Sequence, residues 1–356
     1  MMPSLDRLRQ QMESQSVGMM LASGMMNLRW LTGFTGSSGM AFISSSDAFF
    51  VTDSRYDVQA REQVTNMDVV IYSSPRSLLD VVAEELGKRG LSGELGFEPS
   101  VSFEAWQAWQ EKFAGFTLKP AGNVFPPLRM IKTAEEIAKI ESACKLADAC
   151  MAHVQRMFQP GVSEWDIALD IEFFFRHQGA RLAFEVIAVS GPNSAKPHGR
   201  ASERKLERGD FLTLDFGCEL DGYNSDITRT FILGEASERH AFIYSKVLEA
   251  QVAAIEAIKP GVSSKAVDAV ARDILRDAGL GDYFGHGLGH GLGLDVHDYG
   301  SLSPSRDLPI EVGQVWTVEP GVYIPGFGGV RIEDDVVVEP TGARILTHFP
   351  KQMMVV

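Results

Sequence analysis

The chain is poor in cysteine and has no long apolar run. Its 356 residues include three cysteines, Cys144, Cys150 and Cys218, an odd number without a CxxC pair. This excludes a disulfide scaffold and favours a reducing, cytoplasmic location. No stretch of about 18 apolar residues could form a membrane span. Residues 1–16 are polar and lack the apolar core of a signal peptide. We therefore expect neither export nor membrane insertion.

Basic residues are fewer than acidic residues. The chain carries 33 Lys and Arg against 47 Asp and Glu, a formal net charge of −14. Nucleic acids and anionic membranes bind basic surfaces that replace their counterions, so neither is an expected partner. Carboxylates that cluster around metal cations would account for part of the negative charge.

The length exceeds what one hydrophobic core usually fills, which predicts two domains. Short apolar runs such as 48–52, broken by Gly, Ser and Asn, predict strands in the first part of the chain. Helical patterns over 77–89 and 103–113 alternate with them, which indicates an α/β domain over residues 1–125. Phe125-Pro126-Pro127-Leu128 predicts a stiff, non-helical connection, within a linker over 126–132.

The second predicted domain, 133–356, shows signs of an internal duplication. It opens with Thr133 and Glu136 at capping-box spacing, which predicts a helix to about Phe158. The sequence Pro-Gly-Val-Ser then occurs twice, at 160–163 and 260–263. Alone, this motif is equally well explained as a common helix connector. The segments 209–217 and 313–321 also align, with Gly, Thr, an acid and Gly in register, which favours two related halves.

Each aligned segment carries an acid, and the return segment after it carries another. The pairs are Asp215 with Asp226, and Glu319 with Glu333. An isolated acid in such a hairpin is usually solvated, but Asp215 and Glu319 end apolar runs, where carboxylates are rare unless paired or bound to metal. Related halves would bring the four into one cleft, where they would repel. Two divalent ions would balance four carboxylates, which favours a dinuclear site.

A glycine-rich segment, 285–298, holds three of the eight histidines, His286, His290 and His297. Its glycines let the backbone approach a ligand closely. One apolar-context histidine is usually a core residue, whereas three between two acidic hairpins indicate a functional site. A single imidazole among oxygen ligands suits Mn²⁺ well and Zn²⁺ or Co²⁺ acceptably.

With these motifs in place, the C-terminal part resembles the pita-bread metallopeptidases, which include methionine aminopeptidase, aminopeptidase P and prolidase. The resemblance runs from about Arg129 to the end of the chain and implies a pseudo-two-fold catalytic domain. Metal-free relatives, such as creatinase-like hydrolases and protein-binding modules, lack the full ligand set that is present here. The resemblance to the pita-bread metallopeptidases rests on five motifs. They are Asp215-Phe216-Gly217, Asp226-Ile227-Thr228-Arg229-Thr230, the His286–Asp298 segment, Glu319-Pro320-Gly321-Val322-Tyr323 and Gly329-Val330-Arg331-Ile332-Glu333-Asp334.

The resemblance implies a role for each site residue. Asp226 and Glu333 would bridge two divalent ions, Asp215 would chelate one, and His290 with Glu319 would complete the other. The ions would lower the pKa of a shared water, and Glu319 would relay its proton. Three further histidines and an arginine have implied roles around the substrate. His198, His286 and His297 would donate hydrogen bonds to the reacting carbonyl, and Arg331 would orient a ligand or a substrate group unless it is a surface residue.

The N-terminal part resembles the corresponding domain of prolidases and aminopeptidases P. The similar segments are 27–37 and 53–56. This implies a creatinase/prolidase-like α/β domain, and hence an α/β (α+β) chain overall, and by family analogy a homodimer. It also implies hydrolysis of the bond between an N-terminal residue and proline, whose fixed ring calls for a dedicated pocket.

Three functions remain open from the sequence. A dipeptidase needs a cation for the free carboxylate of its substrate, and Arg55 and Arg306 are the candidates. An aminopeptidase P needs open space for a longer peptide. The compact N-terminal domain favours the dipeptidase slightly. The third possibility is a peptide-binding module without catalysis, which the complete ligand set disfavours.

Overall fold

The structure is a computed structural model that describes residues 4–356. It divides into two compact units, Met1–Arg129 and Met130–Val356. Each unit has its own hydrophobic cores, so each is described separately. No helix in the described range is both long and apolar enough to cross a bilayer.

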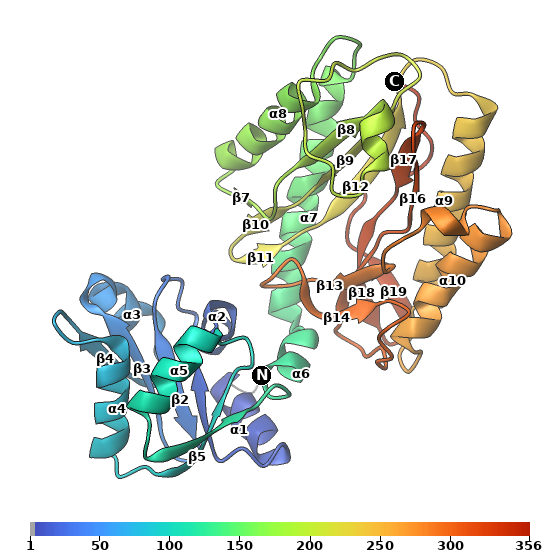
Figure 1. Cartoon of the computed structure of the whole chain (residues 1–356). Coiled ribbons are helices and arrows are strands. Elements are labelled where there is room, and N and C mark those ends of the chain that lie inside the picture. The colour runs from blue at the N-terminus through green and yellow to red at the C-terminus, as the bar shows by residue number, and fades with distance from the viewer. Residues whose placement is uncertain (1–3) are drawn as a thin grey trace. The chain divides into compact units, whose positions relative to one another are not determined.

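The N-terminal unit is built on one six-stranded sheet (Figure 1). Its strands are β1 (Met19–Ala22), β2 (Met40–Ser44), β3 (Ala48–Asp53), β4 (Asp68–Tyr72), β5 (Gly93–Phe97) and β6 (Phe116–Pro120). They lie in the order β4-β3-β2-β1-β5-β6, antiparallel among β1, β2 and β3 and parallel elsewhere. The helices are α1 (Ser4–Ser14), α2 (Met25–Thr32), η1 (Ser54–Tyr56), α3 (Asp57–Gln63), α4 (Leu78–Lys88), α5 (Phe103–Lys112) and α6 (Phe125–Met130).

Alternate residues of these strands enter two different cores. In β2, Ala41 and Ile43 pack with the apolar faces of α1 and α2, whereas Met40 and Phe42 pack with α4 and α5. The alternation follows from the two-residue period of a strand. Helices therefore cover both faces of the sheet, and the predicted α/β architecture is confirmed for this unit.

One local prediction was wrong. The segment expected to be non-helical forms α6, with Pro126 and Pro127 in its first turn. Proline is tolerated there because the first N–H groups of a helix have no acceptor within the helix. The helices predicted over 77–89 and 103–113 are confirmed as α4 and α5.

The second unit contains two helix pairs and four small sheets. Its first half holds α7 (Ala134–Val154), η2 (Gln155–Met157), α8 (Glu164–His177), β7 (Arg181–Leu182), β8 (Ile187–Ser190), η3 (Gly191–Ala195), β9 (Phe211–Phe216), β10 (Cys218–Leu220), β11 (Tyr223–Asn224) and β12 (Ile227–Ile232). Its second half holds α9 (Glu238–Ala257), α10 (Ser264–Asp277), η4 (Gly281–Tyr283), β13 (Gly289–Gly291), β14 (Asp298–Leu302), β15 (Val315–Val318), β16 (Gly321–Ile324), β17 (Gly328–Arg331), β18 (Asp334–Glu339) and β19 (Gly342–Ile345).

The sheets of the second unit follow the two halves. In the first half β12, β9 and β8 form one sheet, and β11, β10 and β7 form another. In the second half the order is β14-β13-β15-β18-β19, beside the hairpin of β16 and β17. Helix α8 lies beside the first-half strands, and α9 and α10 lie beside the second-half strands (Figure 1). The predicted capping box at Thr133 and Glu136 starts α7.

The two halves repeat the same local structure, so the predicted duplication is confirmed. Gly161 and Gly261 turn the chain at φ of 92° and 85°, a left-handed conformation that glycine adopts without steric cost. Ser163 and Ser263 then cap α8 and α10 by accepting a backbone N–H bond. Both serines also form antiparallel bridges to the segments that lead into β9 and β15. Each half thus presents its acidic strand in the same way.

Candidate metal centre

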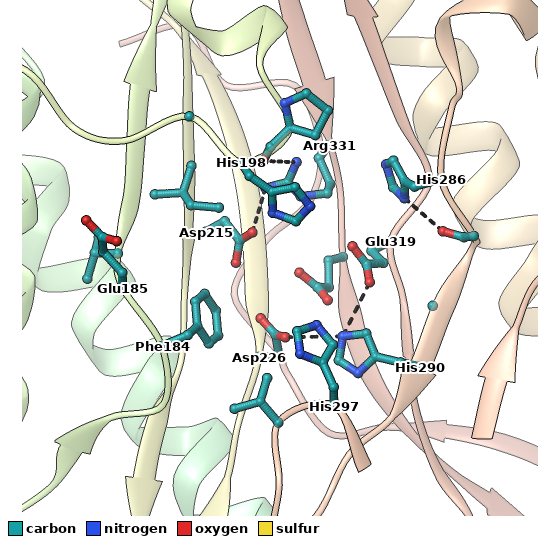
Figure 2. Close-up of a pocket in the computed structure, with 18 of the residues that line it drawn as sticks. Phe184, Glu185, His198, Asp215, Asp226, His286, His290, His297, Glu319 and Arg331 are labelled. Atoms are coloured by element: carbon teal, nitrogen blue, oxygen red, sulfur yellow. Dashed lines mark hydrogen bonds and ion pairs between the residues drawn. The ribbon is translucent and has the colours of Figure 1, made fainter. Parts of the chain in front are cut away.

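A pocket of about 500 Å³ lies among the strands of the second unit, with residues of both halves in its wall (Figure 2). This volume is within the range of small-molecule sites. The wall contains all nine residues that the sequence singled out for the site. They are His198, Asp215, Asp226, His286, His290, His297, Glu319, Arg331 and Glu333.

The four acids come from equivalent ends of two hairpins. Asp215 lies in β9, and Asp226 directly precedes β12, the antiparallel partner of β9. Glu319 follows β15, and Glu333 precedes β18, which pairs with β15 in register. The hairpins therefore direct two carboxylates each into the pocket (Figure 2).

Several carboxylate oxygens in the pocket are buried without a hydrogen-bond donor. Within residues 4–356, Asp215 Oδ1, Asp226 Oδ1 and Glu333 Oε1 have no partner. Burial, with nearby acids, raises the pKa of Asp226 and Glu333 well above the usual range, and burial raises the pKa of Glu319 to about 8. Unpaired buried carboxylates are costly unless a cation compensates them. The oxygens thus fit a site for divalent cations.

His290 presents a free lone pair to this cluster. Its Nδ1 lies 3.1 Å from Gly291 O, and because a carbonyl can only accept, Nδ1 carries the proton. Burial, with His297 nearby, lowers the pKa of His290 to about 4, so Nε2 is unprotonated at neutral pH. Nε2 lies 3.4 Å from Glu319 Oε1 and 3.7 Å from Asp226 Oδ2. A lone pair facing two carboxylate oxygens is the arrangement expected of a metal ligand.

Three side chains offer donor atoms close enough to hold one ion. One atom each of Asp226, His290 and Glu333 lies within 4.8 Å of the other two. Glu319 borders this group on the His290 side, and Asp215 lies beyond Asp226 (Figure 2). Oxygen donors with one imidazole nitrogen suit Mn²⁺, Zn²⁺ or Co²⁺.

Arg331 is a buried member of the site. Its side chain is 4% exposed, and Nη2 donates to Asp215 Oδ2 at 2.5 Å. Nε donates to Thr228 Oγ1 at 3.1 Å, and Nη1 donates to Tyr323 OH at 2.7 Å. The alternative of a surface arginine is therefore wrong. The contact orients Asp215 through a charge-assisted bond.

Tyr323 links Arg331 to His286, a connection that sequence reasoning missed. His286 Nδ1 lies 2.8 Å from Gly287 O and so carries the proton, which leaves Nε2 to accept from Tyr323 OH at 2.9 Å. Burial lowers the pKa of His286 to about 4, which keeps the ring neutral. Both ring nitrogens are thus engaged by the protein. The role of His286 as a donor to substrate stays a prediction.

His198 and His297 have exposed side chains at the pocket wall. The ring of His297 packs 4.3 Å from that of His290. His198 lies in the loop after η3, next to Pro197, whose carbonyl accepts from Arg331 Nη1 at 3.3 Å. Their imidazoles are therefore accessible to a ligand, which is what a donor to the substrate carbonyl needs.

Two further residues hold the ligands in place. Thr228 Oγ1 donates to Glu333 Oε2 at 2.6 Å, and Asp335 Oδ2 accepts from the backbone N–H of Asp226 at 2.9 Å. Thr228 is two positions after Asp226, and strand alternation places both on one face, so the sequence contained a signal for it. Such partners of metal ligands set ligand orientation.

The two candidate cations for a substrate carboxylate belong to different units of the chain. Arg306, in the C-terminal unit, is absent from the pocket wall. Arg55 belongs to the N-terminal unit, where Nε and Nη2 bond both oxygens of Asp53 at 2.8 and 2.9 Å. Arg200, which sequence reasoning did not single out, does line the pocket.

Comparison with known proteins identifies the family. The model of metallopeptidase family M24 matches residues 138–340, and that of the creatinase/prolidase N-terminal domain matches residues 5–131. The chain belongs to metallopeptidase family M24. The resemblance seen in the sequence and the two-domain fold class are thereby confirmed.

Relatives in family M24 match over nearly the whole chain. The Xaa-Pro dipeptidase of Pyrococcus furiosus is 36% identical over 354 residues, covering 98% of this chain and 99% of the relative. The structure of an Xaa-Pro dipeptidase from Bacillus anthracis has a TM-score of 0.95 at 39% identity, covering 99% of both chains. The X-Pro aminopeptidase of Thermotoga maritima has a TM-score of 0.89 at 34% identity, covering 98% of this chain and 100% of that one. The fold is thus shared by relatives of both kinds.

Proposed function

We propose that this chain is a dinuclear metallopeptidase that hydrolyses the bond between an N-terminal residue and proline, with dipeptides as the favoured substrates. The main support for this proposal is that four carboxylates and one imidazole converge on a single pocket. Several of the buried carboxylate oxygens there lack a hydrogen-bond donor. The similarity to Xaa-Pro dipeptidases supports the choice of substrate. The proposal includes a homodimer and a cytoplasmic location, as inferred from the sequence.

Asp226 and Glu333 are proposed to bridge two divalent ions, with Asp215 on one ion and His290 and Glu319 on the other. Mn²⁺ is the favoured metal and Zn²⁺ or Co²⁺ the alternative. When bound, such ions lower the pKa of a water and polarise a carbonyl. The raised carboxylate pKa values would return to the usual range, because a cation favours the charged form.

The residues in and around the metal site are proposed to transfer the proton, stabilise the reacting carbonyl and position the other side chains. Glu319 is proposed to take a proton at a carboxylate oxygen and pass it to the leaving nitrogen of proline. His198 and His297, which are exposed in the pocket, would donate hydrogen bonds to the reacting carbonyl oxygen as it gains charge. Arg331 holds Asp215 and Tyr323 in their places.

The test is hydrolysis by the full chain loaded with Mn²⁺. Ala-Pro, Ala-Pro-Ala and Ala-Ala are compared, each with and without a chelator. We expect cleavage of Ala-Pro, loss of cleavage with chelator, and little cleavage of Ala-Ala. Cleavage of the tripeptide alone would favour an aminopeptidase of the Thermotoga maritima kind. If no peptide is cleaved, the remaining candidate function is a peptide-binding module without catalysis.

Asp226→Asn tests the bridging role. The substitution keeps the shape of the side chain but removes a charge from between the ions, so metal-dependent turnover should fall below about one hundredth of the wild-type value. Circular dichroism checks that the fold is retained. Near-native turnover in this variant would rule out a bridging Asp226.

A further inference from the structure

Relatives of this fold include both dipeptidases and an aminopeptidase, so similarity alone does not decide which substrate length this chain prefers. The chemical difference lies at the far side of proline. A dipeptide ends there in a carboxylate, which needs a cation or several hydrogen-bond donors, whereas a longer peptide continues as a neutral amide. A cation on the pocket wall that is free to bind a carboxylate would therefore favour dipeptides.

Of the Lys and Arg side chains of the C-terminal unit, two line the pocket, Arg331 and Arg200. Arg331 is unsuitable because its donors are already used. Nε, Nη1 and Nη2 bond Thr228, Tyr323 and Asp215, and the side chain is buried. Its charge is balanced within the protein. A substrate carboxylate would have to displace one of these partners.

Arg200 is in the opposite situation. Its side chain is 81% exposed, and its one ion-pair partner among the described residues is Glu185, with Nε 3.3 Å from Oε2. Glu185 is 64% exposed, so the pair is solvated and weak. The two terminal nitrogens of the guanidinium remain available for a bidentate contact with a carboxylate.

The position of Arg200 suits a dipeptide. Arg200 lies two residues after His198, just after the turn that Gly199 N closes by donating to Lys196 O at 2.9 Å. The carboxylate of an Xaa-Pro dipeptide lies one residue beyond the reacting carbonyl, so a substrate held at His198 would present its carboxylate close to this loop. Glu185 and Phe184 lie across the acidic cluster from His286 (Figure 2). The contact with Glu185 therefore places Arg200 on the wall facing His286.

The loop that carries Arg200 is firmly anchored. Glu164, which is fully buried, accepts hydrogen bonds from Ser202 N at 3.1 Å and Ser202 Oγ at 2.6 Å. At the other end of the loop, Asn193 Nδ2 donates to both oxygens of Glu164 at 3.2 Å. The backbone around Arg200 is therefore fixed, while its side chain is exposed.

We propose that Arg200, which lies beside Glu185 on the pocket wall, binds the free carboxylate of a dipeptide substrate and so selects dipeptides over longer peptides. This inference rests on the proposed Xaa-Pro peptidase function. It assigns the carboxylate-binding role to a residue of the His198 loop instead of Arg55 or Arg306.

The test compares Ala-Pro with Ala-Pro-amide, which has the same proline but no negative charge. In the Mn²⁺-loaded full chain, Arg200→Gln should lower the ratio of kcat/KM for Ala-Pro to that for Ala-Pro-amide about tenfold, through a higher KM for Ala-Pro. Arg200→Lys, which keeps the charge but not the bidentate geometry, should lower the ratio by less. Arg306→Gln is the matched control and should leave the ratio unchanged.

The outcomes separate the inference from the proposed function. An unchanged ratio in Arg200→Gln, or an equal loss on both substrates, would overturn the role of Arg200 while the peptidase function stands. A fall of the ratio in Arg306→Gln alone would return the role to Arg306. If the wild-type protein cleaves neither substrate, the peptidase function and the inference fail together.

Discussion

Thr228 contacts two members of the metal centre through one hydroxyl group. It donates to Glu333 Oε2 and accepts from Arg331 Nε. Thr228→Val keeps the shape but removes both bonds, which leaves the guanidinium donor unpaired and frees the carboxylate to rotate. We expect Mn²⁺ affinity to fall about tenfold, the lower end of what such partner substitutions cost.

Isothermal titration with Mn²⁺ measures this effect directly. Thr228→Ser keeps the hydroxyl and is the matched control, with an expected change below about threefold. Equal affinities in the valine and serine variants would show that the hydroxyl does not position Glu333.

His286 should make the stability of the metal-free protein depend on pH. Its pKa in the folded chain is about 4, below the value of about 6.5 in an unfolded chain. Between these values the unfolded chain binds more protons, so stability is lost as the pH falls from 6.5 towards 4. The full effect of this one residue is about 3 kcal/mol.

Urea unfolding in the presence of chelator, at pH 4.5 to 7, tests the sign and the size. In His286→Gln the free energy of unfolding should change less over this interval than in the wild type. Curves of equal slope for the two proteins would contradict the assignment of a buried, neutral His286.

At the scale of secondary-structure elements, helix α8 anchors the loop that carries His198. Glu164 at its start accepts hydrogen bonds from Ser190, Asn193 and Ser202. Glu164→Gln replaces one accepting oxygen with an NH₂ group that faces donors. We expect a loss of about 2 kcal/mol in the free energy of unfolding, because bonds to a buried charge are among the stronger ones.

The matched control lies in the same turn of α8. Asp166 is exposed and accepts from Ser163 in a capping box. Asp166→Asn should cost less than about 1 kcal/mol. Urea denaturation measures the free energy of unfolding of the two variants. Equal losses in both would show that Glu164 contributes no more to stability than a helix-capping residue.

Local signals were sufficient for many elements, and tertiary contacts explain those that were missed. The helix after Thr133 follows from a capping box, which acts over three residues. The proline-rich segment at 125–128 was misjudged because the first turn of a helix tolerates proline. The pairing of His286 with Tyr323 spans 37 positions and has no local signature. The acids were identified because two of them, Asp215 and Glu319, follow apolar runs. A carboxylate is rare at such a position unless it is paired or bound to a metal.

At the scale of the whole molecule, metal binding should affect the two units differently. All the proposed ligands belong to Met130–Val356, while the N-terminal unit has its own sheet and cores. Hydrogen exchange of the full chain, with Mn²⁺ and with chelator, should show metal-dependent protection in β9, β12, β15 and β18. At about 100 times the dissociation constant the gain is about 2.7 kcal/mol.

The strands β1 to β6 provide the internal control for this experiment. Their exchange should change little on metal binding because no proposed ligand belongs to them. Equal protection of both units would contradict a metal effect confined to the C-terminal unit.

The distribution of the ligands over two halves has a consequence for biogenesis. Thr228 and Glu333 meet across 105 positions of the chain, so the cluster does not exist until both halves have been synthesised and docked. Metal ions held by this cluster would therefore bind after both halves have folded, and they would not direct the early steps of folding. A pool of apoprotein made during metal scarcity would be ready for activation as soon as the supply returns.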